Sequence, residues 1–244
     1  MRKFLYPFLI LAAVSSQLHA ENYVRNTSVI DTPTAFTVPR GTYQMSLLAY
    51  EQGGVEFKAF IGIADFFYFG GSFDMENAIG KEKPILNVPG FITKLKFTDG
   101  WENFPISLAI GYDSFYIGQE GKTYNRRNRV DRVIHGPYFV VTKPIYILDD
   151  EQHIHFGVRM PMQPDYVPED TAYFLSLDVP LGEYFIFKAE MERVYYNFTR
   201  PDEWLYNIGL RFSYQRHLGV EFDFMFQPHE RVNRVVRIEY ANEF

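Results

Sequence analysis

An alternation of apolar and polar residues runs through nearly the whole chain and limits what it can fold into. In the last segment, Val236, Ile238 and Tyr240 lie on one face. Arg237 and Glu239 lie on the other. A side-chain period of two is characteristic of β-strands, and no convincing helical period is found in the body of the chain. The pattern therefore predicts an all-β protein.

We assign about twelve strands, an even number, separated by turn residues. Segment 136–143 is the least clear, because Pro137 and Pro144 flank or interrupt it and proline cannot donate to a strand ladder. The predicted strands are 42–50, 55–63, 66–75, 91–98, 106–115, 136–143, 153–162, 171–179, 184–193, 204–214, 218–226 and 236–244.

The links between these segments differ in length. Links after odd-numbered strands tend to be long (76–90, 117–135, 163–170, 194–203 and 227–233), whereas 64–65, 180–183 and 215–217 are short. Links 99–105 and 144–152 are longer than this pattern predicts. Long loops on one side and short turns on the other are typical of an up-and-down barrel, with both chain ends on the short-turn side. The alternative is a soluble β-sandwich, whose strands are usually shorter.

The first twenty residues have the composition of a signal peptide. Arg2 and Lys3 precede an apolar run at 4–14, and Ala20 is a small residue at the expected cleavage point. The run is too short to span a membrane as a helix. The chain has no cysteine, which excludes disulfides and a lipid anchor on a terminal cysteine.

A secretory start, the absence of cysteine, sustained alternation and a final Phe244 together resemble a bacterial outer-membrane β-barrel. The resemblance implies a single antiparallel up-and-down transmembrane barrel over 41–244, in an outer membrane of lipid and lipopolysaccharide. Residues 21–40 would form a periplasmic segment that tucks into the barrel or lies under it. Tyr240 and Phe244 would act as the assembly signal for the barrel-assembly machinery.

Overall charge and hydropathy agree with this assignment. Lys and Arg number 24 and Asp and Glu number 30; without Arg2 and Lys3 the balance is 22 against 30, a net charge near −8. This acidic balance argues against nucleic acid as a partner. The mean hydropathy of −0.20 is wrong for a helical membrane protein but suits a barrel with a polar lumen.

The inward faces of the predicted strands carry both signs of charge. This favours either a water-filled pore whose charges select solutes or a closed interior of ion pairs. Cations are concentrated on early strands and acids on later ones, so barrel closure would bring Lys58 toward Glu239 or Asp223. The predicted pore-lining residues are Glu56, Lys58, Asp74, Lys94, Lys96, Asp113, Arg159, Asp178, Lys188, Glu190, Glu192, Arg211, Glu221, Asp223, Arg237 and Glu239.

The loop at 122–132 is strongly basic in an acidic chain, with Arg126, Arg127, Arg129 and Arg132. Guanidinium groups bind phosphates and carboxylates, so this loop is either a contact for lipopolysaccharide or an anionic solute, or simply a solvated loop. The aromatic residues that we expect near the lipid headgroups are Tyr43, Tyr138, Trp204, Tyr206, Tyr214, Tyr240 and Phe244.

His153 and His155 lie two residues apart on one strand face, a spacing that can present two imidazoles to a metal. No third ligand is evident, so we predict polar lumen residues and neither metal nor cofactor. The sequence contains neither G-x-S-x-G nor H-E-x-x-H, and we predict no catalytic residues and no enzyme activity.

Asp31-Thr32-Pro33-Thr34-Ala35, followed by Pro39-Arg40-Gly41, resembles the start of the YjbH-type outer-membrane proteins tied to exopolysaccharide export. That resemblance implies an accessory role in glycan export. The expected function is therefore passage of small hydrophilic solutes through a porin-like channel. The alternative is a non-conducting structural barrel or one associated with exopolysaccharide export.

Overall fold

A computed structural model describes residues 26–87, 89–100, 105–114, 136–147, 150–160, 171–194, 203–215, 217–226 and 232–244. Within these ranges the chain forms β-strands and one 3-10 turn, η2 (Glu51–Gly53). The strands are β1 (Thr42–Tyr50), β2 (Gly54–Ala64), β3 (Phe67–Glu76), β4 (Ile85–Leu86), β5 (Gly90–Thr98), β6 (Ser107–Asp113), β7 (Gly136–Ile147), β8 (Asp150–Arg159), β9 (Ala172–Leu181), β10 (Phe185–Val194), β11 (Glu203–Tyr214), β12 (Leu218–Phe226) and β13 (Asn233–Glu243).

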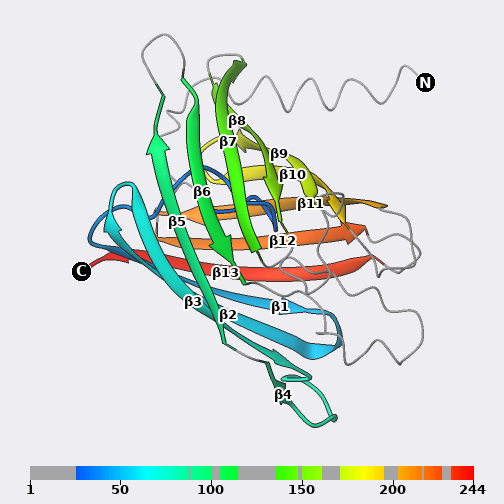
Figure 1. Ribbon diagram of the computed structural model, residues 1–244. Helices are drawn as coiled ribbons and strands as arrows, with labels where there is room; N and C mark the ends of the chain where they lie inside the picture. Colours follow the sequence, from blue (N-terminus) through cyan, green and yellow to red (C-terminus); the bar gives the residue numbers. More distant parts are fainter. Residues whose placement is uncertain are drawn as a thin grey trace, which may run out of the picture.

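The described strands close into a 12-strand antiparallel barrel, as the sequence predicts (Figure 1). Each long strand pairs with its neighbour along the chain, and β1 pairs with β13, with Thr42 opposite Glu243. The short β4 stands outside this cycle. It pairs only with the end of β3, from which it projects beyond the barrel (Figure 1).

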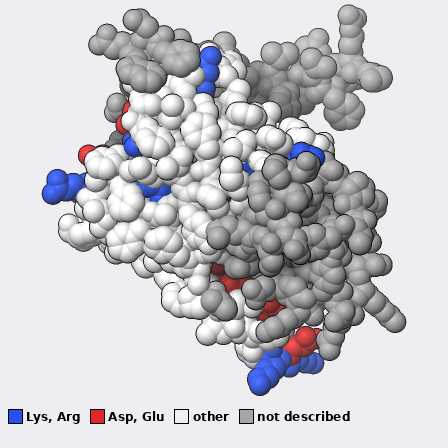
Figure 2. Space-filling view, viewed as in Figure 1, with Lys and Arg blue, Asp and Glu red and all other residues white. Residues whose placement is uncertain are grey.

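Side-chain exposure alternates along the strands in the predicted register. In β9, Tyr173 and Leu175 are 40% and 43% exposed, whereas Phe174 and Ser176 are buried. The outward positions are mostly apolar, and the face seen in Figure 2 is predominantly uncharged. The barrel thus presents an apolar exterior and a polar interior, the arrangement expected of a strand-built membrane protein.

Strand β7 differs from the prediction. It runs through both Pro137 and Pro144, which pair by position with Tyr112 and His153, and only residues 148–149 separate it from β8. The link is therefore shorter than the predicted 144–152. The register of β7 also turns Tyr138 into the lumen, where it is buried, so the prediction of a headgroup-level Tyr138 is wrong.

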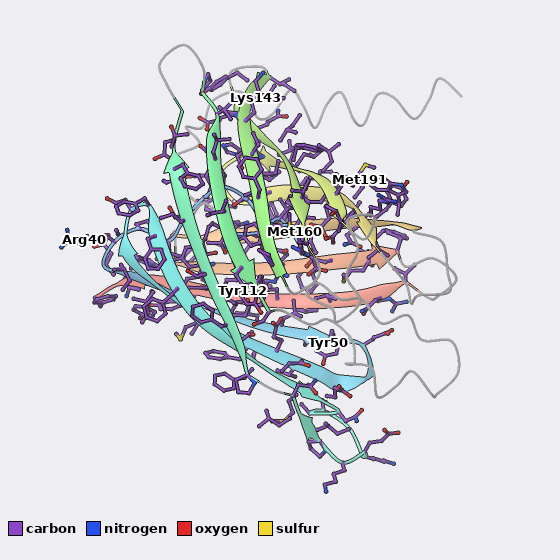
Figure 3. All side chains as sticks on the ribbon, viewed as in Figure 1. Arg40, Tyr50, Tyr112, Lys143, Met160 and Met191 are labelled. Carbon is purple, nitrogen blue, oxygen red and sulfur yellow. The ribbon has the colours of Figure 1, made fainter. Side chains whose placement is uncertain are left out.

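The start of β1 and the end of β13 lie at one end of the barrel, where the Phe244 N–H donates to the Gly41 carbonyl oxygen at 2.9 Å. Figure 3 places Arg40 at this end and Tyr50 toward the other. The links at this end are 65–66, 99–106, 148–149, 182–184 and 215–217, and all but 99–106 have two or three residues. At the opposite end, every link other than η2 has six or more residues. In the described ranges, no helix is long and apolar enough to cross a membrane.

The outward register of β9 gives a direct test of the lipid-facing surface. Replacing Leu175 with arginine should lower the free energy of unfolding by about 2–4 kcal/mol, because the charge would enter the hydrocarbon layer. The matched change Leu181→Arg, at the end of the same strand and on the same face, should cost about 0–1 kcal/mol. Urea unfolding of the refolded proteins in lipid vesicles measures both values. Equal costs at the two positions would contradict a depth-dependent lipid contact.

Candidate functional site: a filled lumen

The segment before β1 lies inside the barrel. Residues 27–38 are buried except for Ser28, which is half-buried, and they contact inward side chains of β5, β7, β8, β10 and β13. In Figure 1 this blue segment runs among the strands. Of the two positions that the sequence left open, inside or under the barrel, the structure shows the first. We call residues 27–38 the plug.

The plug begins with a tight hairpin. The Val29 N–H donates to the Thr32 carbonyl at 2.9 Å, and the Thr34 N–H donates to the Thr27 carbonyl at 3.1 Å. These bonds bring the two arms together and leave the N–H groups at the tip pointing outward toward the wall. A hairpin this short offers no hydrogen-bond partners for the main-chain N–H and C=O groups at its tip. Side chains of the barrel wall must therefore supply these partners.

Glu190 on β10 accepts the hydrogen bonds of the hairpin tip. Its Oε2 lies 3.1, 3.0 and 3.0 Å from the amide nitrogens of Ile30, Asp31 and Thr32, and 2.8 Å from Thr32 Oγ1. Asn207 Nδ2 holds the other carboxylate oxygen, Oε1, at 2.7 Å. Consecutive N–H groups that converge in this way form an anion-binding nest. Here the anion belongs to the barrel wall and the nest to the plug.

Three wall cations bind the carbonyl groups of the same turn. Lys188 Nζ donates to the Val29 carbonyl oxygen at 2.6 Å. Arg237 Nη2 donates to the Ile30 carbonyl oxygen at 2.7 Å, and Arg159 Nη2 donates to that of Asp31 at 3.3 Å. Successive main-chain groups of the tip are therefore held by charged side chains from three strands.

The same cations are also paired with carboxylates of the wall. Glu221 on β12 accepts from Lys188 and, at 3.2 Å, from Arg237. Glu192 accepts from Arg159 at 3.0 Å. Charge pairs that hydrogen-bond in this way are stronger than neutral ones and fix the direction of each side chain. The wall thus orients its donors independently of the plug.

Lys94 on β5 holds the base of the hairpin. Its Nζ donates to the carbonyl oxygens of Thr27 and Thr34 at 2.7 Å each and to that of Phe36 at 3.0 Å. The ammonium also lies 5.5 Å from the centre of the Tyr68 ring, a cation–π distance. Since this side chain is fully buried, the three carbonyl groups replace the water that a charged lysine otherwise needs.

A second polar network ties the plug to β7, β8 and β9. The Ala35 N–H donates to Thr142 Oγ1 at 2.8 Å, and Thr142 Oγ1 lies 2.8 Å from His155 Nδ1. Asp178 then bridges the two histidines, 2.6 Å from His155 Nε2 and 3.0 Å from His153 Nδ1. The hydroxyl of Thr142 is buried under the plug, so this row of groups is closed to a substrate in the observed state.

The predicted approach of Lys58 to Glu239 or Asp223 differs from the ion pairs observed. Lys58 Nζ lies 3.6 Å from Glu56 and 3.8 Å from Asp113, whereas Glu239 pairs with Arg211. Lys58 and Glu239 do line one small cavity of about 30 Å³ between plug and wall. That volume holds one or two water molecules, so little free space remains at this place.

The charged residues that were predicted to face inward do point to the interior of the barrel. Lys58, Lys96 and Asp113 are half-buried, and Lys96 pairs with Asp99 near the barrel end at 2.8 Å. Asp74 sits apart from the plug contacts and accepts from Tyr50 and Asn87. The buried members are Glu56, Asp74, Lys94, Arg159, Asp178, Lys188, Glu190, Glu192, Arg211, Glu221, Asp223, Arg237 and Glu239.

Some predicted site residues lie outside the described ranges, and some participants were not predicted. The basic loop with Arg126, Arg127, Arg129 and Arg132 falls outside the residues that the structure describes. Sequence reasoning missed Thr142, and it placed Ser176 and Asn207 on the inward face without giving them a role. Their inward positions in alternating strands were the available signal for Ser176 and Asn207.

No protein-family model matches the sequence, and no curated protein matches it. The structure, however, is similar to two solved structures of the KdgM porin, at TM-scores of 0.51 and 0.53 and with 10% and 9% sequence identity. Each match covers 83% of this chain and 99% of that porin, and the second was solved in complex with disordered oligogalacturonate. The chain has the fold of a porin-like outer-membrane β-barrel.

In this porin-like barrel a glycine of the wall leaves room for a buried arginine. A Cβ atom on Gly219 of β12 would lie 2.5 Å from Arg211 Nη2. The arginine needs that space to reach Glu239 on β13. The porin-like barrel thus has a charged lumen, and the plug lies packed inside it.

Proposed function

We propose that this chain is an outer-membrane channel for small hydrophilic solutes that its own plug holds closed. The observation that carries the proposal is the burial of residues 27–38 in the lumen, with their main-chain groups bound by wall charges. Solutes would pass when the plug withdraws. Export would depend on the predicted signal peptide at 1–20, and lipopolysaccharide and the barrel-assembly machinery would be its partners in the membrane.

The way the plug is attached supports movement. The plug belongs to no strand of the barrel, and Pro39 and Arg40, which follow it in the sequence, are exposed. Gly41 follows with a φ of 73°, a conformation that glycine adopts without strain, and a Cβ atom at this position would meet no other atom within 4 Å. Withdrawal of the plug about this point would leave the pairing of β1 with β2 and β13 intact.

The chemistry of the wall also supports an opened, wet lumen. An interior meant to stay dry is normally apolar, because buried ion pairs contribute little net stability. Here Arg159, Lys188 and Arg237 keep carboxylate partners when the plug is gone, and both signs would line the passage. Such a lining suits small polar solutes. The oligogalacturonate of the KdgM porin complex is a polar ligand of a barrel with this fold.

A filled lumen also favours the alternative, a non-conducting barrel associated with exopolysaccharide export. Of the residues that resemble YjbH-type proteins, 31–35 are buried in the plug, whereas Pro39 and Arg40 are exposed. In the observed state the buried part is not available to a glycan outside the barrel. A measurement of ion conduction distinguishes the solute channel from the non-conducting barrel.

A disulfide between plug and wall tests the channel. Thr32 Oγ1 lies 2.8 Å from Ser176 Oγ, and the chain has no native cysteine, so Thr32→Cys with Ser176→Cys makes one defined pair. In planar bilayers the wild-type protein should show brief openings. The oxidised double variant should show none, and reduction should restore them.

Each single cysteine variant, treated with the same oxidant, is the control and should still open, with an open fraction that does not change on oxidation or reduction. Unchanged openings in a protein shown by mass spectrometry to be cross-linked would contradict gating by the plug. Silence of the folded wild type, and of a variant with a weakened plug contact, would favour the non-conducting barrel.

A further inference from the structure

We infer that the lumen is a binding site for a tight polypeptide turn, and that a separate peptide can replace the plug. The plug is then a resident ligand that happens to be tethered to its receptor. This assigns the porin-like barrel a ligand class, a peptide main chain, beyond its proposed role as a channel.

The contacts at the tip are directed to main-chain atoms. The N–H groups of Ile30, Asp31 and Thr32 and the carbonyl groups of Val29, Ile30 and Asp31 all reach wall side chains. From the side chains of this turn, the Thr32 hydroxyl donates to Ser176 Oγ and Glu190 Oε2. The wall therefore recognises the path of the main chain more than the identity of its residues.

Two features select which turns fit. Gly209 on β11 leaves room for the residue at the tip: a Cβ atom there would lie 3.3 Å from Ile30 Cδ1 and 2.1 Å from Asp223 Oδ1. The hydroxyl of Thr32 lies 2.8 Å from both Ser176 Oγ and Glu190 Oε2. The preferred ligand is a turn with a medium-sized apolar residue at its second position and a hydroxyl at its fourth.

The site does not need its ligand to take shape. Glu221 orients Lys188 and Arg237, Glu192 orients Arg159, and Asn207 orients Glu190, all through wall-to-wall bonds. Preorganised donors bind a ligand without the loss of entropy that ordering them would cost. An emptied lumen would thus offer the same set of partners to a second peptide.

The test releases the tether after folding. A recognition sequence for a specific protease is inserted between Arg40 and Gly41, where Arg40 is exposed, and the full mature chain is folded before cleavage. A fluorescent peptide of residues 26–40 is then added, and its binding is followed by anisotropy and gel filtration. This readout requires no current, so it succeeds or fails independently of the proposed channel.

We expect the cleaved plug to remain bound and the labelled peptide to exchange with it in a saturable manner. A peptide N-methylated at Asp31 keeps every side chain but loses a donor to Glu190, and should bind at least about tenfold more weakly. Methylation at Ser28, whose N–H has no described bond to the wall, is the matched control and should change binding little.

A second variant covers the case in which the insertion prevents folding. The intact chain with Ser176→Cys is incubated with an excess of peptide that carries Thr32→Cys, and the adduct is detected by mass after oxidation. Peptide bound in the lumen gives a disulfide at this position. Failure of the cleaved plug to exchange, absence of the adduct, or equal binding of the Asp31-methylated peptide would each overturn the inference.

Discussion

Replacing Glu190 with glutamine should raise the open fraction of the channel by about ten- to a hundredfold. The carboxylate accepts the N–H groups of Ile30, Asp31 and Thr32, whereas a glutamine amide has one acceptor oxygen and turns an NH₂ group toward donors. Hydrogen bonds to a charged group are worth about 1.5–3 kcal/mol, and 1.4 kcal/mol is a factor of ten in an equilibrium constant. Single-channel recording of the full mature chain measures the open fraction directly.

The control for this prediction is Glu239→Gln. That change removes the same charge from the lumen, but Glu239 pairs with Arg211 of the wall and has no described hydrogen bond to the plug. Its open fraction should stay near that of wild type. If both variants opened equally, the cause would be the charge of the lumen, and the role assigned to Glu190 would be wrong.

Replacing Phe244 with serine should greatly reduce the amount of folded barrel in the membrane while hardly changing its stability. The side chain is 78% exposed, and the residue's described bond, from its N–H to Gly41, survives the substitution. A surface position of this kind usually changes the free energy of unfolding by no more than about 0.5 kcal/mol. The loss would therefore arise before the barrel is complete, when the terminal aromatic residue is recognised.

Two measurements separate these effects. Heat-modifiable migration of the membrane fraction reports the folded amount in cells, and urea unfolding of refolded protein reports stability. The matched change is Phe226→Ser. Phe226 is also exposed and lies on β12, at the barrel end opposite to Phe244, so this change should alter stability more than assembly. Normal levels of folded Phe244→Ser protein in cells would remove the basis for calling this residue an assembly signal.

The strands and their faces could be predicted from sequence because a membrane barrel repeats one rule along its length. Leu175 is exposed and Lys188 is buried for the same reason, their place in a period of two. The rule failed at β7, where Pro137 and Pro144 obscured the period and Tyr138 was misplaced. It also gave no sign of β4, which is too short to show a pattern.

The position of the plug could not be derived in the same way. Residues 27–38 have no period, and their partners are scattered from Asp65 to Arg237. A mostly uncharged stretch of this kind can lie inside the lumen or under the barrel. Only the positions of the charged side chains of the wall decide between the two places. Charged residues were predicted to face inward, but whether they would meet water, each other or another part of the chain depends on three-dimensional closure.

The contact between Ile30 and Arg237 joins residues 207 positions apart, nearly the two extremes of the chain. Arg237 lies on β13, which pairs with β1 to shut the cylinder. The hairpin tip can therefore find its complete set of partners only after β13 has taken its place. A seated plug is thus a built-in report that the circle of strands is closed, and a barrel in which β13 is missing or unpaired would leave the plug loose.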